Sequence, residues 1–166
     1  MTPAAALPDP SGGAPDGKRA LRLWLRLLTC SHIIEQTIAQ RLRDDFGSTL
    51  PRFDMLSALE RAGEDGLTMG EVSRMLMVSN GNVTGLARRL EADGLIERLP
   101  GPDRRVQRVR LTASGRARFA AMATAHEGWI DNLLAGLTPD ETDELTRLLE
   151  RTRRSLRTAI DEEPRR

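Results

Sequence analysis

Arginine side chains are concentrated in one stretch of the chain, where they could bind phosphate groups. Between Ser79 and Arg118 the sequence has nine arginines and four acidic residues, a net charge of +5, whereas the whole chain of 166 residues has a net charge of +1. Positive charge gathered on one segment is typical of a surface that binds the phosphate backbone of a nucleic acid. The average charge of the chain therefore conceals a candidate binding surface.

A predicted helix from Asn80 to Asp93 places side chains that could bond bases inside this basic stretch. Its apolar residues recur at the spacing of one helix face, and the opposite face is polar. Asparagine can bond adenine through two hydrogen bonds, arginine can bond guanine, and threonine offers a methyl group to thymine. The candidate DNA-binding residues on and beside this helix are Ser79, Asn80, Asn82, Thr84, Arg88 and Arg89.

Two glycines, Gly81 and Gly85, belong to the same polar face. Glycine within a helix is less favourable than alanine by about 1 kcal/mol. Their presence therefore suggests that a partner approaches the helix backbone closely. The alternative is an ordinary solvated face that begins with a helix cap at Ser79 or Asn80.

A β-hairpin is expected directly after this helix. Leu95–Leu99 and Val106–Thr112 have the alternating or β-branched pattern of strands, and a turn rich in proline and glycine separates them. An arginine at a hairpin tip can enter a narrow minor groove, where negative potential is concentrated. Arg104 and Arg105 are the candidates at the tip, and Arg108 is a further candidate on the returning strand. Which of Arg104 and Arg105 enters the groove stays open.

The elements that must position these side chains are helical. A helix is expected from Ala20 to Phe46, a second opens at Pro51, and a short third helix begins at the capping box Thr68–Glu71. After the hairpin, one long helix follows Thr112 and a last helix begins at a second capping box, Thr138–Glu141. This order predicts a mainly α fold: a winged helix–turn–helix with additional N- and C-terminal helices.

Four regions follow from this order. Residues 1–18 are expected to be a disordered tail, because the first seventeen residues contain four prolines and three glycines. Residues 49–112 form the winged helix–turn–helix DNA-binding region, residues 19–48 and 113–162 form a helical dimerisation region, and residues 163–166 fray. The outer helices have apolar faces too large for the small module to cover, so a symmetric homodimer is the simplest cover and an intramolecular bundle is the alternative.

The composition excludes several other classes of protein. One cysteine and two histidines provide neither a disulfide framework nor a Cys/His zinc finger. The sequence has no glycine-rich phosphate loop, nucleophile elbow or Cys/His pair, so it is not expected to be an enzyme or to hold a cofactor. It also has no secretory signal and no apolar stretch of the roughly 20 residues that span a bilayer. We therefore expect a cytoplasmic protein with no membrane partner.

Four sequence motifs resemble the MarR family of bacterial transcriptional regulators. They are the run Val78–Leu86, the run Arg89–Arg98, the Asp103-Arg104-Arg105 wing and the segment Leu111–Gly115. The resemblance extends from about Leu21 to Leu156. It implies a homodimer that binds double-stranded DNA at a palindromic operator, usually as a repressor, with a recognition helix in the major groove and wings in the flanking minor grooves. The tip Leu99–Asp103 is about a residue shorter than the family pattern.

The same resemblance implies a small-molecule effector that releases the DNA. The segment Leu50–Asp54 is similar to family members near aromatic-acid catabolism, which implies an aromatic acid or an aromatic acyl-CoA such as a hydroxycinnamoyl-CoA. Arginines would bind the phosphates of a thioester, whereas packing within the protein is the alternative role for the histidine and the tryptophans. The candidate effector-binding residues are Arg22, Trp24, Arg26, His32, Gln36, Arg52, Phe53 and Trp129.

Two other functions compete with a ligand-responsive DNA-binding regulator. One is a winged-helix module that binds protein without specific DNA binding, which the basic wing argues against. The other is a redox-sensing regulator based on Cys30. We expect Cys30 to be a buried, inert thiol instead, because the chain has no tyrosine to tune it. Met69, Met75 and Met77 are expected to pack inside the winged module.

Overall fold

The computed structural model describes residues 18–99 and 108–162, except for the side chain of Asn80. The predictions for the N-terminal tail, the frayed C-terminus, the Asn80 side chain, and Arg104 and Arg105 at the hairpin tip lie outside the described residues. The chain divides into two compact units, Met1–His126 and Glu127–Arg166. These two units reflect how densely the chain contacts itself and say nothing about function. The DNA-binding and dimerisation regions expected from the sequence therefore stay a prediction.

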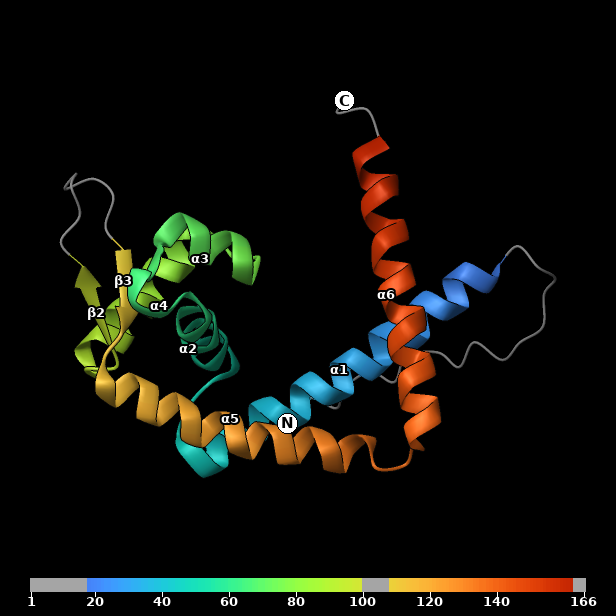
Figure 1. The fold of residues 1–166 in the computed structure, drawn as a ribbon, viewed down its shortest axis with the longest axis horizontal. Coiled ribbons are helices and arrows are strands. Elements are labelled where there is room, and N and C mark those ends of the chain that lie inside the picture. Colours follow the sequence, from blue (N-terminus) through green and yellow to red (C-terminus); the bar gives the residue numbers. More distant parts are fainter. Residues whose placement is uncertain (1–17, 100–107, 163–166) are drawn as a thin grey trace, which may run out of the picture. The chain divides into compact units, whose positions relative to one another are not determined.

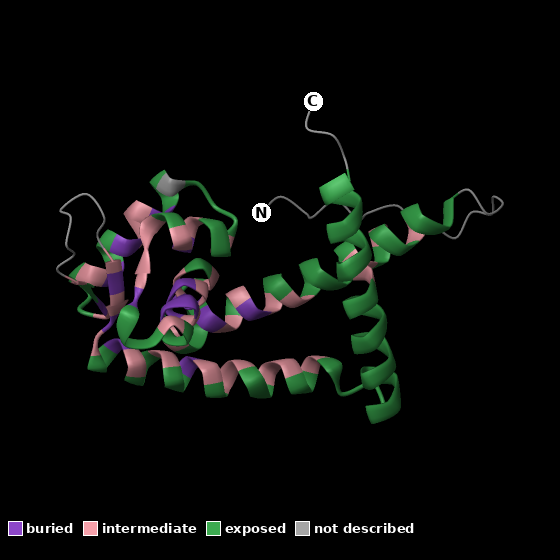
Figure 2. Cartoon of the chain, turned by 45° about the horizontal axis from the view of Figure 1, so that its top comes forward, coloured by how far each residue is buried: buried purple, intermediate pink, exposed green. Residues whose placement is uncertain are grey.

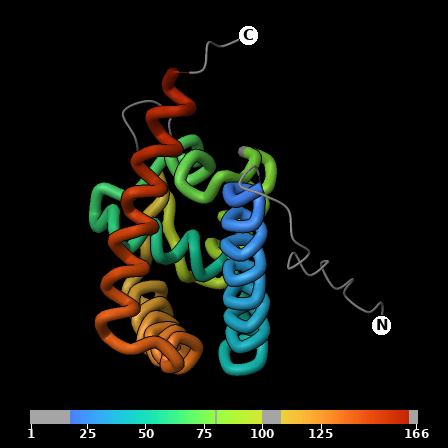
Figure 3. The backbone as a smooth tube through the Cα atoms, turned by 90° about the vertical axis from the view of Figure 1, so that its right-hand side faces the viewer, coloured from blue at the N-terminus to red at the C-terminus, as the bar shows by residue number. Residues whose placement is uncertain are grey.

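The first unit contains nearly all the elements (Figure 1). In chain order they are α1 (Arg19–Phe46), α2 (Leu50–Ala62), a 3₁₀ turn η2 (Gly63–Asp65), β1 (Leu67–Thr68), α3 (Met69–Leu76), α4 (Asn80–Ala92), β2 (Ile96–Leu99), β3 (Arg108–Leu111) and the first part of α5 (Ala113–Leu134). Helix α1 is one uninterrupted helix along its described length (Figure 3). It ends where Gly47 adopts a left-handed φ of 57°, as glycine does at helix ends. The helices predicted from periodicity are confirmed.

The sheet is small and antiparallel, with strand order β1-β3-β2. Residues Ile96–Leu99 of β2 pair with Arg108–Leu111 of β3, which confirms the hairpin. The described strand ends differ from the prediction by one residue: β2 begins after Leu95, and β3 ends before Thr112. The predicted strand residues Val106 and Gln107 lie outside the described residues. Strand β1 was not predicted, because it has two residues and exists only through its pairing with Val109 and Arg108.

The core of the first unit lies beneath the helix–turn–helix and the sheet (Figure 2). Each element contributes the apolar side chains of one face. The buried side chains are Ile38 and Leu42 of α1, Phe53, Met55, Leu56, Ala58 and Leu59 of α2, Val72 of α3, Val83, Ala87 and Leu90 of α4, Ile96, Val109 and Leu111 of the hairpin, and Met122 of α5. Ala62 of α2 and Leu86 of α4, which follow the apolar spacing of their helices, are only half-buried.

The joint between the hairpin and α5 is a close approach of two backbones. Thr112 caps α5, since its hydroxyl accepts the Gly115 N–H at 2.9 Å, and its own N–H donates to the Leu95 carbonyl at 3.1 Å. A Cβ atom at Gly115 would lie 1.9 Å from that carbonyl oxygen. No side chain fits there, so glycine is required at this position.

Some side chains are placed differently from expectation. The expectation that Cys30 is buried is wrong, because Cys30 is exposed on α1. The prediction that Met75 and Met77 pack inside the winged module is also wrong. Both residues are exposed, and Met77 is 94% exposed. Met77 ends α3 with a left-handed φ of 53°, a conformation that costs a non-glycine residue about 1–2 kcal/mol. The spacing of apolar residues could not show which side of α1, or of the C-terminal end of α3, has no other element packed against it in the protomer.

The second unit consists of the end of α5 and α6 (Pro139–Glu162). The predicted capping box begins α6: the Thr138 hydroxyl accepts the Glu141 N–H at 3.3 Å, and the Glu141 carboxylate accepts the Thr138 N–H at 2.8 Å. No described residue of this unit is buried in the protomer. The apolar face expected on the last helix is exposed in the protomer: Leu145, Leu148, Leu149, Leu156 and Ile160. That a second chain covers them stays a prediction. None of the helices in the described ranges carries an apolar stretch that could cross a lipid bilayer.

Candidate nucleic-acid interface

Helix α4 is held in the helix–turn–helix by a cap at one end and apolar packing along one face. Ser79 is the N-cap, and its hydroxyl accepts the Asn82 backbone N–H at 3.5 Å. Val83, Ala87 and Leu90 are buried against the rest of the module. This packing turns the face with Asn82, Arg88 and Arg89 outward, as predicted.

The outward face of α4 has polar groups with no partner in the protein. In the described part of the chain, the side chains of Asn82, Arg88 and Arg89 make no hydrogen bond or ion pair. All three are exposed, and Thr84 beside them is half-buried. Exposed donors and acceptors along the outer face of such a helix can bond base edges or phosphates.

The glycines of this face have no packing reason within the described chain. A Cβ atom at Gly81 or Gly85 would meet no atom within 4 Å. Both positions also line a hollow of about 560 Å³ beside α4, together with side chains of α2 and the end of α3. The remaining residues that line it are Thr49, Pro51, Asp54, Leu76, Val78, Asn82, Leu86 and Arg89. That something outside the protomer approaches the helix here stays a prediction.

The arginines at the base of the hairpin are paired with acids, in contrast to those of α4. Arg110 of β3 donates to Glu64 at 2.7 Å and to Glu97 at 2.8 Å, and Arg116 of α5 donates to Glu64 at 3.0 Å. The hydrogen bond that Arg110 donates to the Glu97 carboxylate raises the pKa of Arg110. Arg98 pairs with Glu91 at 3.0 Å. The net charge of the segment counted from the sequence therefore overstates the free positive charge.

Arg108 and Arg118 also bond within the protein. Arg108 donates to the carbonyls of Asp65 at 2.8 Å and Gly66 at 2.9 Å, and it lies 3.6 Å from Glu71. Arg118 donates to the Phe46 carbonyl and lies over the Phe46 ring, 5.3 Å from its centroid. The predicted DNA contact of Arg108 stays a prediction, and its observed role is to tie β3 to the η2 turn. The charge count from Ser79 to Arg118 could not include the partners Glu64 and Glu71, because both acids precede that segment in the chain.

The candidate effector residues occur on three helices and are placed in different ways. On α1, Arg22 is half-buried, Trp24 and Arg26 are exposed, and His32 and Gln36 bond each other at 2.8 Å. On α2, Arg52 forms an ion pair with Asp93 at the end of α4. Trp129 is half-buried on α5 and belongs to the second unit.

Phe53 belongs to an aromatic cluster in the core. It is stacked against His126 with ring centroids 4.9 Å apart, and it lies 5.6 Å from the Phe119 ring. Next to it, burial raises the pKa of Asp54, an effect that nearby His126 partly opposes and Glu35 reinforces. Phe53 and Arg52 thus have contacts within the protein, and their role in effector binding stays a prediction.

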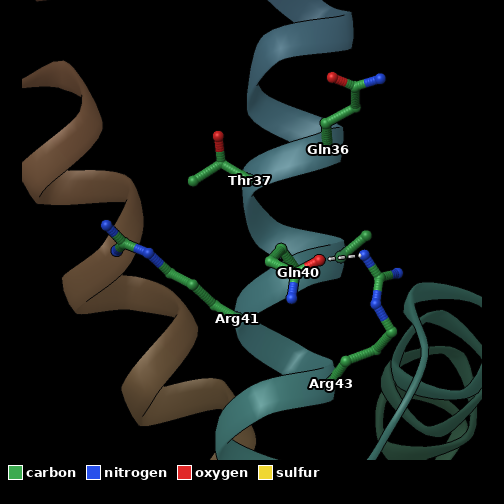
Figure 4. Close-up of a pocket in the computed structure, with 6 residues that line it drawn as sticks. Gln36, Thr37, Gln40, Arg41 and Arg43 are labelled. Carbon is green, nitrogen blue, oxygen red and sulfur yellow. Dashed lines mark hydrogen bonds between the residues drawn. The ribbon is translucent and has the colours of Figure 1, made fainter. Parts of the chain in front are cut away.

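A hollow of about 620 Å³ lies along α1 (Figure 4). Its lining comes from Gln36, Thr37, Ala39, Gln40, Arg41 and Arg43. Arg43 donates to the Gln40 side-chain oxygen at 2.7 Å. Only Gln36 of the predicted effector residues lines this hollow, so the structure does not gather the predicted set around it.

Comparison with known proteins gives one consistent match. A family model described as MarR family matches residues 46–106. The transcriptional activatory protein BadR of Rhodopseudomonas palustris is 36% identical over 114 residues, which are 66% of this chain and 65% of BadR. The chain therefore spans 65% of the length of this relative.

Solved structures agree over a larger share of the chain. A MarR family transcriptional regulator from Silicibacter pomeroyi shares 29% identity with a TM-score of 0.73, covering 87% of this chain and 99% of that one. A mutant MarR from E. coli complexed with operator DNA shares 26% identity with a TM-score of 0.69, covering 83% of this chain and 99% of that one.

A helix–turn–helix whose second helix has an exposed polar face, followed directly by a β-hairpin, defines a winged helix–turn–helix protein. These proteins share the arrangement of α3, α4, β2 and β3 seen here. The family model over residues 46–106, BadR and the two solved structures show that this chain is similar to the MarR family. The three relatives named above are transcriptional regulators and MarR proteins rather than enzymes.

Proposed function

We propose that this protein is a DNA-binding transcriptional regulator that binds double-stranded DNA through α4. The observation that carries the proposal is the outward face of α4, where Asn82, Arg88 and Arg89 have no partner in the described chain and two glycines have no neighbour. A solved relative in complex with operator DNA supports the same use of the fold. In this proposal α4 enters the major groove, and Arg104 or Arg105 of the wing enters the minor groove.

The test of DNA binding is fluorescence anisotropy with a labelled duplex from the region upstream of the gene, beside a scrambled duplex of equal length. We expect Asn82→Ala and Arg88→Ala to reduce the preference for the upstream duplex, and affinity to fall steeply with salt as counterions are released. Arg147→Ala is the matched control, because Arg147 is an exposed arginine of α6 that pairs with Glu144. Equal affinity of the wild-type protein for both duplexes would contradict sequence-specific binding.

The proposed active form is a homodimer that binds a palindromic operator. The apolar side chains of α6 that are exposed in the protomer, such as Leu148 and Leu156, support this proposal because exposed apolar stripes usually mark interfaces. Trp24 and Ile33 of α1 are exposed as well. Analytical ultracentrifugation should give twice the protomer mass of 18.4 kDa. Half-sites for α4 of the two copies should lie about 34 Å apart, which operator footprinting can measure.

The proposed sign of regulation is repression, with release by an aromatic acid or an aromatic acyl-CoA. This proposal rests on the resemblance of the segment Leu50–Asp54, and the name of BadR as an activatory protein opposes the repressor part. A reporter under the upstream region should rise in a deletion strain if the protein represses and fall if it activates. Thermal shift with benzoate, 4-coumarate and 4-coumaroyl-CoA tests the ligand class, and no shift with any of them would remove it.

A winged-helix module that binds protein instead of DNA remains the competing proposal, and the anisotropy measurement decides between them. Redox sensing by Cys30 is a further alternative, which the exposed thiol makes testable. Peroxide treatment of the wild-type protein and of Cys30→Ser should then change DNA affinity only in the wild-type protein.

A further inference from the structure

The carboxylate of Glu64 joins two arginines from different elements at the base of the wing. Its Oε2 accepts a hydrogen bond from Arg110 Nη1 at 2.7 Å, and its Oε1 accepts one from Arg116 Nη1 at 3.0 Å. Arg110 belongs to β3 and Arg116 to the first turn of α5, while Glu64 itself lies in the η2 turn. The Nε of Arg110 also donates to Glu97 of β2 at 2.8 Å. These side chains therefore link four elements, and we call them the Glu64 cluster: Glu64, Glu97, Arg110 and Arg116.

A second set of bonds ties the other edge of the same segment to β3. Arg108 donates to the carbonyls of Asp65 and Gly66, and β1 pairs with β3 directly after them. The backbone at Gly66 passes so close to β3 that a Cβ atom there would lie 2.3 Å from the Val109 carbonyl oxygen. The segment from Glu64 to Thr68 is thus packed against β3 along its length.

The sheet needs such support, because it is too small to fix its own orientation. Strands β2 and β3 have four residues each in the described chain, and β1 has two. A two-stranded hairpin is at best marginally stable alone in water. The connection between β2 and β3 contains Arg104 and Arg105, so the direction of the hairpin decides where these arginines can reach.

We infer that Glu64 is a positioning residue for DNA binding, which holds the wing in the direction that lets its arginines reach the minor groove. The inference rests on the proposed function. For the DNA affinity of Glu64→Gln, the inference predicts the opposite change from that expected from the change in net charge alone. Glu64 is an acid beside the DNA-binding module, its side chain is 68% exposed, and Glu64→Gln removes a negative charge from beside Arg110 and Arg116. Long-range electrostatics alone therefore predicts that Glu64→Gln binds DNA more tightly, whereas positioning predicts weaker binding.

The experiment compares Glu64→Gln with Glu60→Gln, a matched control. Glu60 is an exposed acid at the end of α2, and its carboxylate makes no hydrogen bond or ion pair among the described residues. Anisotropy with the labelled upstream duplex should show a loss of about three- to ten-fold in specific affinity for Glu64→Gln, since the network orients the wing through several coupled bonds. Glu60→Gln should bind as tightly as the wild-type protein or slightly more tightly.

Two further measurements separate positioning from a loss of fold. Affinity for the scrambled duplex should not fall in Glu64→Gln, because the loss of a negative charge does not weaken the attraction of the protein to phosphates. Glu64→Asp should recover part of the specific affinity, and Arg116→Gln should reproduce the loss without adding to it in the double variant. These two variants also serve if Glu64→Gln does not fold.

The outcomes are distinct. Equal or tighter specific binding of Glu64→Gln overturns the inference while the proposed function stands. Additive losses in the double variant with Arg116→Gln also overturn it, because the two side chains would then act separately. No binding of the wild-type protein to either duplex overturns the proposed function itself, and the inference with it.

Discussion

Replacement of the two open glycines of α4 by alanine should separate stability from DNA binding. Gly85 lies in the middle of α4 and Gly81 in its first turn, and a Cβ atom meets nothing within 4 Å at either position. The substitutions therefore cause no clash, and alanine is favoured over glycine in a helix interior by about 1 kcal/mol. Gly85→Ala should raise the melting temperature by about 2–4 °C in a chain of this size. Gly81→Ala should give a smaller rise.

The DNA affinity of the same variants should fall. If the glycine face lies against a groove wall, each added methyl group pushes the helix backbone away from the bonds made by its neighbours Asn82 and Arg88. We expect Gly85→Ala to lose about ten-fold in affinity for the upstream duplex, a change of about 1.4 kcal/mol. The assay is fluorescence anisotropy, with thermal melting of the same preparations.

The chain supplies controls at other open helix glycines. Gly70 occupies the same first-turn position in α3 that Gly81 occupies in α4, and Gly128 lies within α5. A Cβ atom at either position also meets nothing within 4 Å. Gly70→Ala and Gly128→Ala should stabilise the protein without a loss of affinity. If Gly85→Ala gained stability and bound DNA as tightly as the wild-type protein, the assignment of this face to the DNA would be refuted.

Three further substitutions, in α2 and at the two ends of α3, test the stability of the first unit. Met77→Gly should stabilise the protein by about 1 kcal/mol in urea denaturation, because it removes a left-handed non-glycine residue whose side chain is exposed; an unchanged or lower midpoint would contradict this. Thr68→Ala should cost about 1 kcal/mol, because it removes the cap of α3. Asp54→Asn should raise the melting temperature at pH 7.5. Burial raises the pKa of Asp54 above its ordinary value of 3.8, so its charge destabilises the folded protein above the folded pKa, and the gain should shrink as the pH falls toward 3.8. A gain that grew on acidification would show the opposite sign.

Local signals predicted the helix–turn–helix well. The two capping boxes mark the starts of α3 and α6, and Ser79 marks the start of α4, because these caps bond backbone groups only three residues away. The inward face of α4 followed from periodicity alone. Features that depend on distant residues were missed: β1 exists through a partner about forty residues later, at Val109.

The sequence predicted that the candidate interface is positively charged, but it did not predict which arginines are free to contact DNA. Counting charges along the chain treated all arginines between Ser79 and Arg118 as equal. In the fold, Arg110 and Arg116 meet Glu64, and Arg108 meets the η2 turn, so the unpartnered arginines in the described part of that segment are those of α4. The effector residues were predicted least well, since spacing along α1 and α2 does not show which side chains share a cavity.

The Gly115 contact has a mechanical consequence for the protein. The backbone of α5 lies against the Leu95 carbonyl with no room for a side chain, and Thr112 bonds to both Gly94 and Leu95. A joint this tight leaves little freedom to bend. A shift in the first turns of α5 is therefore expected to move β2 and β3 together with the helix.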